Sequence, residues 1–333
     1  MLYDWFRINN RWRLDSVVKK YVCIIGKGSI GVRHGKIFEK IGCNVTYFRQ
    51  KKSSSLQKNE IKNIKDLKKK IDLICICNPT SLHSRTFIQF QDISKNFFIE
   101  KPSFNKASDI KKIFRIIKKK KINIFSGYMF RFDPRILLIK SIIKKSKIRY
   151  ANFIWQTFMP NWHPWENYKN SYASIKKLGG GVLLTCSHEI DMAQNLFGKV
   201  NKVFCTDTIS NLGTNVENSV FLILIHKNGI KSNITIDFSS KQSQRIFEIS
   251  GNDLNIIWNF KNKKVLIKKK NKIYFKKPRV DSNINKIYLY QNKMHLKNLY
   301  KKQNKNLNSL FHTEKIILTA LKSMRSKKIE ILK

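Results

Sequence analysis

The feature that most constrains the fold of this chain is a glycine-rich turn between a short apolar run and a helical pattern. The run Tyr21–Ile25, YVCII, is rich in β-branched residues and predicts a buried strand. A G-x-G-x-x-G pattern follows at Gly26, Gly28 and Gly31, and the helical pattern leads on to a second predicted strand at residues 44–48. Because it lies between a strand and a helix, the pattern predicts a dinucleotide-binding βαβ unit.

The residues of this turn have separate predicted roles. Gly26 permits the tight turn, Gly28 lets a pyrophosphate approach the main chain, and Gly31 lets the helix pack closely on the strand. Ser29 and Ile30 open the helix, where free N–H groups face the phosphates. We therefore expect all five residues to bind the cofactor; the alternative is a tight βα turn without a ligand.

Alternating strands and helices continue to about residue 126. Repeated βα units predict a doubly wound parallel sheet, in which ligands bind beyond the carboxyl ends of the strands. Gly26, Asn78 and Lys101 follow three such strands, so we expect them to converge on one crevice, with Pro79 and His83 beside Asn78 as further cofactor-binding residues. The pattern predicts helices at residues 61–70, 83–94 and 108–120 and strands at residues 71–77 and 96–100.

After about residue 127 the pattern becomes that of an α/β domain with an open, mostly antiparallel sheet. Two strand patterns flank a turn at residues 227–229, which is a hairpin signal. A polar segment at 276–305 indicates a loop and a loose helix, and residues 312–324 fit an amphipathic helix with Thr313 as its N-cap. We therefore divide the chain into an N-terminal arm (1–20), a dinucleotide-binding Rossmann domain (21–126) and a substrate-binding and oligomerisation domain (127–333).

Composition suits two globular domains in a reducing compartment. The chain has 333 residues, of which 42% are hydrophobic, enough for two sizeable cores. The six cysteines form no C-x-x-C pair, which favours a reduced, cytoplasmic protein. No segment has the roughly 18 unbroken apolar residues of a membrane span, and the N-terminus lacks the apolar region of a secretory signal. We therefore expect no membrane partner.

The net charge of +46 raises the question of a nucleic-acid partner, because a basic surface attracts polyanions. The lysines are spread along the whole chain and occur together with abundant isoleucine and asparagine, a bias typical of AT-rich genomes. The sequence contains no stacked-aromatic RNA motif, zinc finger or basic zipper. We therefore expect a solvated basic surface and no nucleic-acid partner; salt-sensitive retention on DNA would indicate the alternative.

Two residues carry the predicted chemistry. Lys101, in the stretch EKPSF, follows a strand end and is restrained by Pro102, so it can bond a substrate hydroxyl; the alternative is an exposed loop lysine. His188 lies in LGGGVLLTCSHEIDMAQNLFG. If one helix runs through this stretch, Thr185, His188 and Asp191 share a face. The carboxylate would then orient the imidazole as a proton acceptor; the alternative is a histidine in a core contact.

Three glycines, Gly179–Gly181, precede that helix. A bare main chain at a helix start suits a ligand pressed against it. The glycines therefore predict that the helix start approaches the substrate and the nicotinamide.

Five motifs occur in an order that resembles the Gfo/Idh/MocA family, which includes glucose–fructose oxidoreductase and inositol dehydrogenase. They are GKGSIGVRH, NPTSLH, EKPSF, GYMFRFDP and GGGVLLTCSHEIDMAQNLFG. The resemblance covers the chain from about Tyr21 to its end. It implies a Rossmann domain, an α/β domain with an open sheet, a tightly held nicotinamide cofactor, and homo-dimers or homo-tetramers formed through that sheet. It also implies that Lys101 and His188 are the catalytic pair; many members carry an aspartate one turn before the histidine, where this chain has Leu184 and Thr185.

A further stretch, WHPWENYKNSYASIKKLGGG, resembles a subset of the family found among enzymes that make sialic-acid-like and other surface sugars. Aromatic faces pack on sugar C–H surfaces and polar side-chain tips bond hydroxyl groups, whereas the alternative is a structural loop. The predicted substrate-binding residues are Arg131, His163, Trp165, Tyr168, Tyr172, Thr185 and Asp191.

The predicted reaction is a reversible hydride transfer between nicotinamide and a carbinol or carbonyl carbon of a sugar or sugar nucleotide. His188 takes the hydroxyl proton and Lys101 steadies the developing oxyanion, and no metal is expected. The alternative is a cofactor-binding sensor without turnover, since a fold does not determine a function.

The choice of cofactor depends on the end of the second strand, in NVTYFRQKKSS. An NAD-binding Rossmann fold places an acidic residue there for the ribose 2′-hydroxyl, but the sequence shows no Asp or Glu near Phe48 to Gln50. Arg49 lies there instead and can bind a 2′-phosphate with paired hydrogen bonds. The sequence therefore slightly favours NADP over NAD; the alternative is that Arg49 stacks on the adenine and admits either. Glu100, next to Lys101, is the remaining cofactor-binding candidate.

Overall fold

The computed structural model describes residues 19–49, 59–67, 70–162, 164, 166–208, 212–301 and 311–332. They form two compact units. The Rossmann unit comprises the described residues within 9–129 and 284–311, and the mixed-sheet unit comprises those within 130–283 and 312–333.

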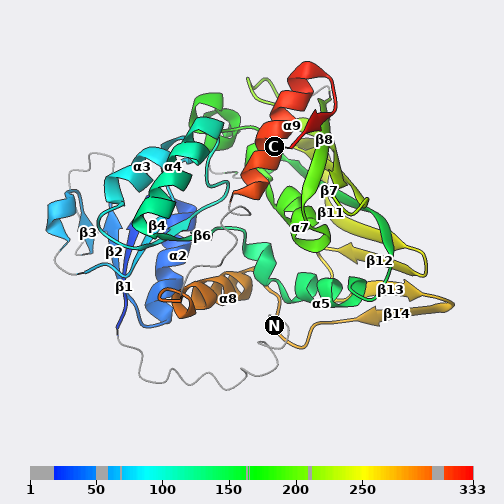
Figure 1. Cartoon of the computed structure of the whole chain (residues 1–333), viewed down its shortest axis with the longest axis horizontal. Helices are drawn as coiled ribbons and strands as arrows, with labels where there is room; N and C mark the ends of the chain where they lie inside the picture. The colour runs from blue at the N-terminus through cyan, green and yellow to red at the C-terminus, as the bar shows by residue number, and fades with distance from the viewer. Residues whose placement is uncertain are drawn as a thin grey trace. The chain divides into compact units, whose positions relative to one another are not determined.

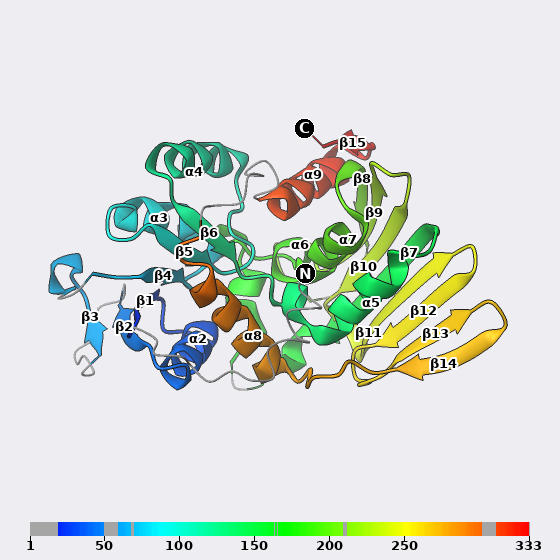
Figure 2. The ribbon, with the colours of Figure 1, turned by 60° about the horizontal axis from the view of Figure 1, so that its bottom comes forward.

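The Rossmann unit is built on a parallel sheet with the strand order β3-β2-β1-β4-β5-β6 (Figure 1). Helix α2 packs on α8 and α3 packs on α4, and the two pairs cover opposite faces of the sheet (Figure 2). The central strands β1, β4 and β5 are buried and almost entirely apolar, as expected for strands covered on both faces, and the predicted doubly wound sheet is confirmed. The elements are β1 (Tyr21–Ile25), α2 (Ser29–Lys40), β2 (Asn44–Phe48), β3 (Glu60–Ile61), β4 (Leu73–Ile76), α3 (His83–Phe90), β5 (Asn96–Ile99), α4 (Ala107–Lys120), β6 (Asn123–Ser126) and α8 (Ile284–Lys297).

The helix predicted at residues 61–70 is wrong. Glu60 and Ile61 instead pair with Tyr47 and Phe48 as the edge strand β3, and only a 3₁₀ turn follows at Ile64–Asp66. The next residue, Leu67, has extended backbone angles (φ −70°, ψ +93°), so this turn does not continue into an α-helix. This pairing brings Glu60 beside the end of β2.

The segment around α8 belongs to the Rossmann unit, whereas the sequence placed all of 127–333 in the second domain. Tyr288 of α8 packs edge-on against the ring of His34 in α2, and the ring of His295 lies 5.2 Å from that of Phe98 in β5. Leu299 completes the same apolar core. The sequence did not predict that this segment packs on the Rossmann unit, because 276–305 is polar and α8 buries polar side chains together with apolar ones.

The mixed-sheet unit is built on a sheet with the order β14-β13-β12-β11-β7-β10-β9-β8-β15. Strands β7 and β10 pair in parallel and the other neighbouring pairs are antiparallel, so the predicted open, mostly antiparallel sheet is confirmed. The predicted hairpin at residues 227–229 is confirmed between β9 and β10. The strands are β7 (Ile148–Phe158), β8 (Val200–Asp207), β9 (Ser219–His226), β10 (Lys231–Asp237), β11 (Ser239–Gly251), β12 (Leu254–Asn259), β13 (Val265–Lys269), β14 (Lys272–Lys276) and β15 (Glu330–Ile331).

Among the described residues, helices cover one face of this sheet and none covers the other (Figure 2). The helices are α5 (Pro134–Ile143), the short α6 (Val182–Thr185), α7 (His188–Phe197) and α9 (His312–Ser326). In β9, Val220, Leu222 and Leu224 are buried, while Phe221 and Ile223, which alternate with them, are exposed. Among the helices described, none is long and apolar enough to cross a membrane.

Thr313 lies inside the first turn of α9, so it is not the predicted N-cap. Its hydroxyl donates instead to the Asp191 carboxylate of α7, 2.8 Å away. The threonine therefore ties two helices together instead of closing the end of its own.

Candidate active site

The carboxyl edge of the Rossmann sheet brings the first predicted residues together. Gly26, Asn78 and Lys101 follow β1, β4 and β5, which are neighbouring parallel strands. Gly26 has a φ of +97°, and a Cβ placed on it would lie 2.7 Å from the Asn78 nitrogen. Only a glycine lets the two strand ends approach this closely.

The turn after β1 forms a cradle of suitable shape for a phosphate. A Cβ on Gly31 would lie 2.0 Å from the Gly26 carbonyl oxygen, so α2 presses directly on the turn. Gly28, the N-cap of α2, is exposed, and a Cβ placed on it would meet nothing within 4 Å. The first N–H groups of a helix, here from Ser29 and Ile30 onward, have no partner within the helix and favour an anion. The residues present therefore fit a dinucleotide pyrophosphate.

Asn78, Pro79 and His83 shape the loop after β4. The Asn78 amide donates to the Thr86 hydroxyl over 2.8 Å, and Pro79 precedes a 3₁₀ turn. The ring nitrogens of His83 lie 3.0 Å from the Ser103 carbonyl oxygen and 2.8 Å from that of Asn78. Burial lowers the pKa of His83. His83 therefore joins two loops of the protein, a structural position that the sequence did not distinguish from cofactor binding.

The Glu100 carboxylate is anchored inside the Rossmann unit. One oxygen lies 2.8 Å from Nε2 of His34 in α2, and the other accepts the Lys101 main-chain N–H over 2.9 Å. A Cβ on Gly127 would lie 2.8 Å from this carboxyl group. Glu100 thus fixes the main chain of the half-buried Lys101, whose peptide bond to Pro102 is cis. Sequence reasoning missed His34, although its position three residues after Gly31 places it on the same helical face.

Arg49 has an acidic partner that the sequence did not predict. Its Nη1 donates to a carboxylate oxygen of Glu60 over 3.0 Å, and the ammonium of Lys27 contacts the same oxygen. The Glu60 side chain is buried, and those of Arg49 and Lys27 are partly exposed. The prediction that no acidic residue lies near this strand end is therefore wrong, because Glu60 comes from β3, a strand that overlaps the helix predicted at 61–70.

The stretch that holds His188 is two helices, not one. Helix α6 ends at Thr185 and α7 begins at His188, and Cys186 breaks the helical geometry between them with a φ of −100° and a ψ of +30°. The shared face predicted for Thr185, His188 and Asp191 is therefore wrong with respect to Thr185. Thr185 is buried in the mixed-sheet unit.

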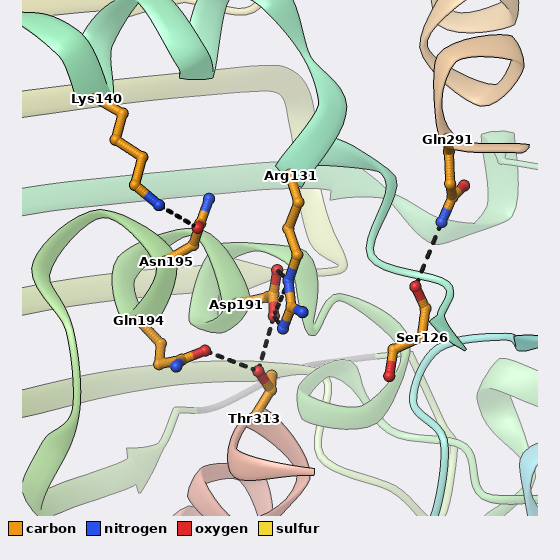
Figure 3. A network of polar contacts seen from close by, with 8 residues as sticks. All are labelled: Ser126, Arg131, Lys140, Asp191, Gln194, Asn195, Gln291 and Thr313. Atoms are coloured by element: carbon orange, nitrogen blue, oxygen red, sulfur yellow. Dashed lines mark hydrogen bonds and ion pairs between the residues drawn. The ribbon is translucent and has the colours of Figure 1, made fainter. Parts of the chain in front are cut away.

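Asp191 and Arg131, both predicted to bind substrate, form an ion pair with each other (Figure 3). The carboxylate accepts from Nε of Arg131 over 2.9 Å and from Nη2 over 2.5 Å, and it also accepts from the Thr313 hydroxyl over 2.8 Å. Asp191 is 1% exposed. These contacts give the carboxylate the role of joining α7, α9 and the segment before α5, whereas the sequence assigned it to the imidazole of His188.

Aromatic rings surround His188 and the start of α7. Its ring meets the ring of Phe130 edge-on with 4.8 Å between the centroids. The next residue, Glu189, accepts from Nε of Arg245 over 2.7 Å. The Arg245 guanidinium in turn lies over Phe130 and Trp155, 4.5 and 4.2 Å from their ring centroids. This arginine–aromatic cluster holds the start of α7 in place.

The glycines before α6 accommodate the protein's own side chain. Gly181 has a φ of +110°, and a Cβ on it would lie 2.2 Å from a Glu217 carboxylate oxygen. That oxygen accepts the Leu183 N–H over 3.3 Å, and burial raises the pKa of Glu217 to about 7. At Gly181 the glycine is therefore required by the close approach of the Glu217 carboxylate, and the predicted approach of this helix start to a substrate stays a prediction.

The four predicted sugar-binding residues of the loop have different positions. The Tyr168 hydroxyl donates to the Leu212 carbonyl over 3.0 Å, which makes it a loop anchor. Tyr172 is 41% exposed. His163 and Trp165 lie outside the described residues.

Two family models match successive parts of the chain. Residues 20–128 match a family model described as "Oxidoreductase family, NAD-binding Rossmann fold", and residues 138–256 match the model of the "GFO/IDH/MocA C-terminal domain". Together the two models cover more than half of the chain. The chain belongs to the Gfo/Idh/MocA family. The resemblance on which the sequence interpretation rested is confirmed at the level of this family.

Three known proteins illustrate what the chain is similar to. It is 27% identical over 129 residues to inositol 2-dehydrogenase of Rhizobium meliloti, covering 39% of this chain and 37% of the relative. It is 24% identical over 153 residues to 2,7-anhydro-N-acetylneuraminate hydratase of Escherichia coli, covering 45% and 39%. A levoglucosan dehydrogenase in complex with NADH and L-sorbose has the same fold, with a TM-score of 0.82, 15% identity and coverage of 95% and 99%. The chain spans about half the length of the first curated relatives it matches.

Proposed function

We propose that this Gfo/Idh/MocA protein is an NAD(H)-dependent oxidoreductase that acts on a carbinol carbon of a sugar or polyol. The observation that carries the proposal is the cradle at the start of α2, where Gly28 leaves open space beside the first N–H groups of the helix. The family model for this half of the chain is described as NAD-binding. A nicotinamide dinucleotide bound there supplies the hydride acceptor or donor.

Lys101 and His188 supply the acid–base chemistry in this proposal. The imidazole of His188 takes the proton of the substrate hydroxyl, and the ammonium of Lys101 stabilises the negative charge that develops on the oxygen. Glu100 supports this role by fixing the Lys101 main chain, and the Phe130 ring supports it by holding the His188 ring edge-on.

The relatives and the loop at residues 162–181 support the proposed substrate class. Two relatives are named for inositol and levoglucosan, which are polyhydroxylated rings, and a third relative is named for a sialic-acid derivative. We propose a surface-sugar or sialic-acid-like substrate, with the exposed ring of Tyr172 available to pack on it. We propose a cytoplasmic location, because all six cysteines are buried free thiols, as is typical of a reducing compartment.

The open face of the mixed sheet supports the proposed homo-oligomer. Tyr150 of β7 is 42% exposed, and Phe221 and Ile223 of β9 are 52% and 38% exposed. Strand β10 lies between β7 and β9 in the sheet, where Lys231 pairs with Tyr150 and Asn233 pairs with Ile223. Exposed aromatic and aliphatic side chains on one sheet face favour association with a second copy.

Turnover and binding measured together test the proposed function. We expect Lys101→Ala and His188→Ala to lower kcat by about 10²–10⁴-fold on the best of levoglucosan, myo-inositol and 2,7-anhydro-N-acetylneuraminate. The dissociation constant for NAD⁺ should stay within about threefold, because neither change touches the glycine cradle. Lys106→Ala, an exposed lysine at the start of α4, is the control for charge. NAD⁺ binding without turnover on any sugar would instead favour a cofactor-binding sensor.

A further inference from the structure

We infer that Glu60 determines the choice between NAD and NADP, acting as a positioning residue through Arg49 and Lys27. The inference rests on the proposed dinucleotide function. It replaces the slight preference for NADP, which depended on Arg49 having no acidic neighbour.

The position of Glu60 follows from the sheet. Strand β3 pairs with the end of β2, so that Glu60 lies opposite Tyr47, and the Arg49 N–H donates to the Ile61 carbonyl over 2.8 Å. On the other side, the Gly26 N–H donates to the Phe48 carbonyl. The end of β2 therefore lies between the glycine turn and the edge strand. In a Rossmann fold this is where the ribose of the adenosine is recognised.

One buried carboxylate serves two cations at this place. Arg49 reaches Glu60 from the end of β2, and Lys27 reaches it from the glycine turn, while the Lys27 ammonium also lies 5.2 Å from the centroid of the Tyr47 ring. The Glu60 side chain is 2% exposed, compared with 28% for Arg49 and 19% for Lys27. The two cations therefore form the accessible layer, and the carboxylate beneath them sets their orientation and cancels one of their two charges.

Glu60 weakens the attraction of this cluster for a 2′-phosphate. A guanidinium that donates to Glu60 has fewer N–H groups left to bind a phosphate. The negative charge of the buried carboxylate also repels the phosphate, and a low dielectric strengthens this repulsion. A 2′-hydroxyl carries no charge, so neither effect weakens its binding. Glu60 thus supplies from β3 the acidic selectivity that other Rossmann folds take from β2.

Calorimetric titration of the full chain with NAD⁺ and with NADP⁺ tests this inference. Glu60→Gln keeps the shape and removes the charge, so we expect tighter NADP⁺ binding and a ratio Kd(NADP⁺)/Kd(NAD⁺) about tenfold lower than in the wild type. Adding Arg49→Met to this variant should abolish the gain, because the gain acts through the guanidinium. Glu39→Gln removes an exposed carboxylate of α2 and should leave the ratio unchanged.

Glu60→Asp keeps the charge and separates electrostatics from shape, so its ratio should stay within about threefold of the wild type. It also keeps the test informative if Glu60→Gln fails to fold, because a tenfold fall in this ratio with Asp would contradict a charge effect. A ratio that moves equally in Glu60→Gln and Glu39→Gln, or in neither, overturns the inference. Failure of the wild type to bind either dinucleotide would instead overturn the proposed function.

Discussion

The two units of the molecule build their candidate site residues in different ways. In the Rossmann unit, the cradle is made by main-chain atoms of Gly26 to Gly31, which are adjacent in sequence. In the mixed-sheet unit, Asp191 is held by Arg131 and Thr313, which are 60 and 122 residues away from it. A main-chain site can be recognised from a short motif, whereas a side-chain site depends on which distant segments meet. Substitutions in the two units should therefore have different effects on binding and on stability.

The largest effect is expected in the cradle, where Gly28 and Gly31 should differ. Gly28→Val has room for its side chain in the free protein, so the free energy of unfolding should change by less than about 0.5 kcal/mol. The added side chain occupies the space of the pyrophosphate, so NAD⁺ binding by calorimetry should weaken by at least about a hundredfold. Gly31→Val forces a Cβ against the Gly26 carbonyl and should cost about 3 kcal/mol or more in stability. Equal stability losses in the two variants would contradict separate roles for the glycines.

The second effect concerns the remote side-chain contacts of Asp191. Arg131→Met leaves a buried carboxylate without its cation, so we expect a loss of about 3 kcal/mol in the free energy of unfolding. Thr313→Val removes one hydrogen bond and should cost about 1 kcal/mol. Urea unfolding measures both. Losses that simply add in the double variant would show that the two contacts are independent and would weaken the contrast with the Rossmann unit.

The third effect is a pH dependence of stability in the mixed-sheet unit. The pKa of Glu217 is raised to about 7 in the folded protein, from an ordinary value of 4.5, by burial beneath α6. The folded protein therefore holds a proton that the unfolded chain loses between pH 4.5 and 7. Its contribution to stability is present below about pH 4.5 and is lost as the pH rises through 7. Because glutamine does not ionise, we expect the free energy of unfolding of Glu217→Gln to fall by about 1 kcal/mol less than that of the wild type as the pH rises, a value that allows for solvent screening. Thermal melting of both proteins between pH 5 and 8 checks the slope, and identical slopes would contradict the assignment.

The smallest effect on the folded chain is expected at the open face of the mixed sheet. Phe221→Lys places a charge on this face and should convert a dimer or tetramer to monomers in light scattering, with the free energy of unfolding of the monomer within about 0.5 kcal/mol. Ile329→Lys is the control, since Ile329 is also exposed, at 58%, and lies just before β15. Dissociation by the control but not by Phe221→Lys would contradict the proposed surface.

Much of the fold was predictable because its signals are local. The strand–turn–helix order at residues 21–48, the strands at residues 71–77 and 96–100 and the hairpin at residues 227–229 depend on apolar periodicity and on glycine sterics within a few residues. The helix predicted at 61–70 failed because β3 exists only by pairing with β2. The break at Cys186 also escaped prediction, since a helical pattern can continue across two short helices.

The sequence by itself therefore determined the family, the doubly wound sheet, the glycine cradle and the candidates Lys101 and His188, because each depends on the order and spacing of neighbouring residues. Only the tertiary structure decided the partners of the charged side chains. It brought Glu60 to Arg49, Arg131 and Thr313 to Asp191, Glu217 to Gly181, and α8 back to α2 across 258 residues. The reason is physical: a side chain in the interior bonds whichever group packing brings within about 3 Å, and packing joins segments without regard to their separation along the chain.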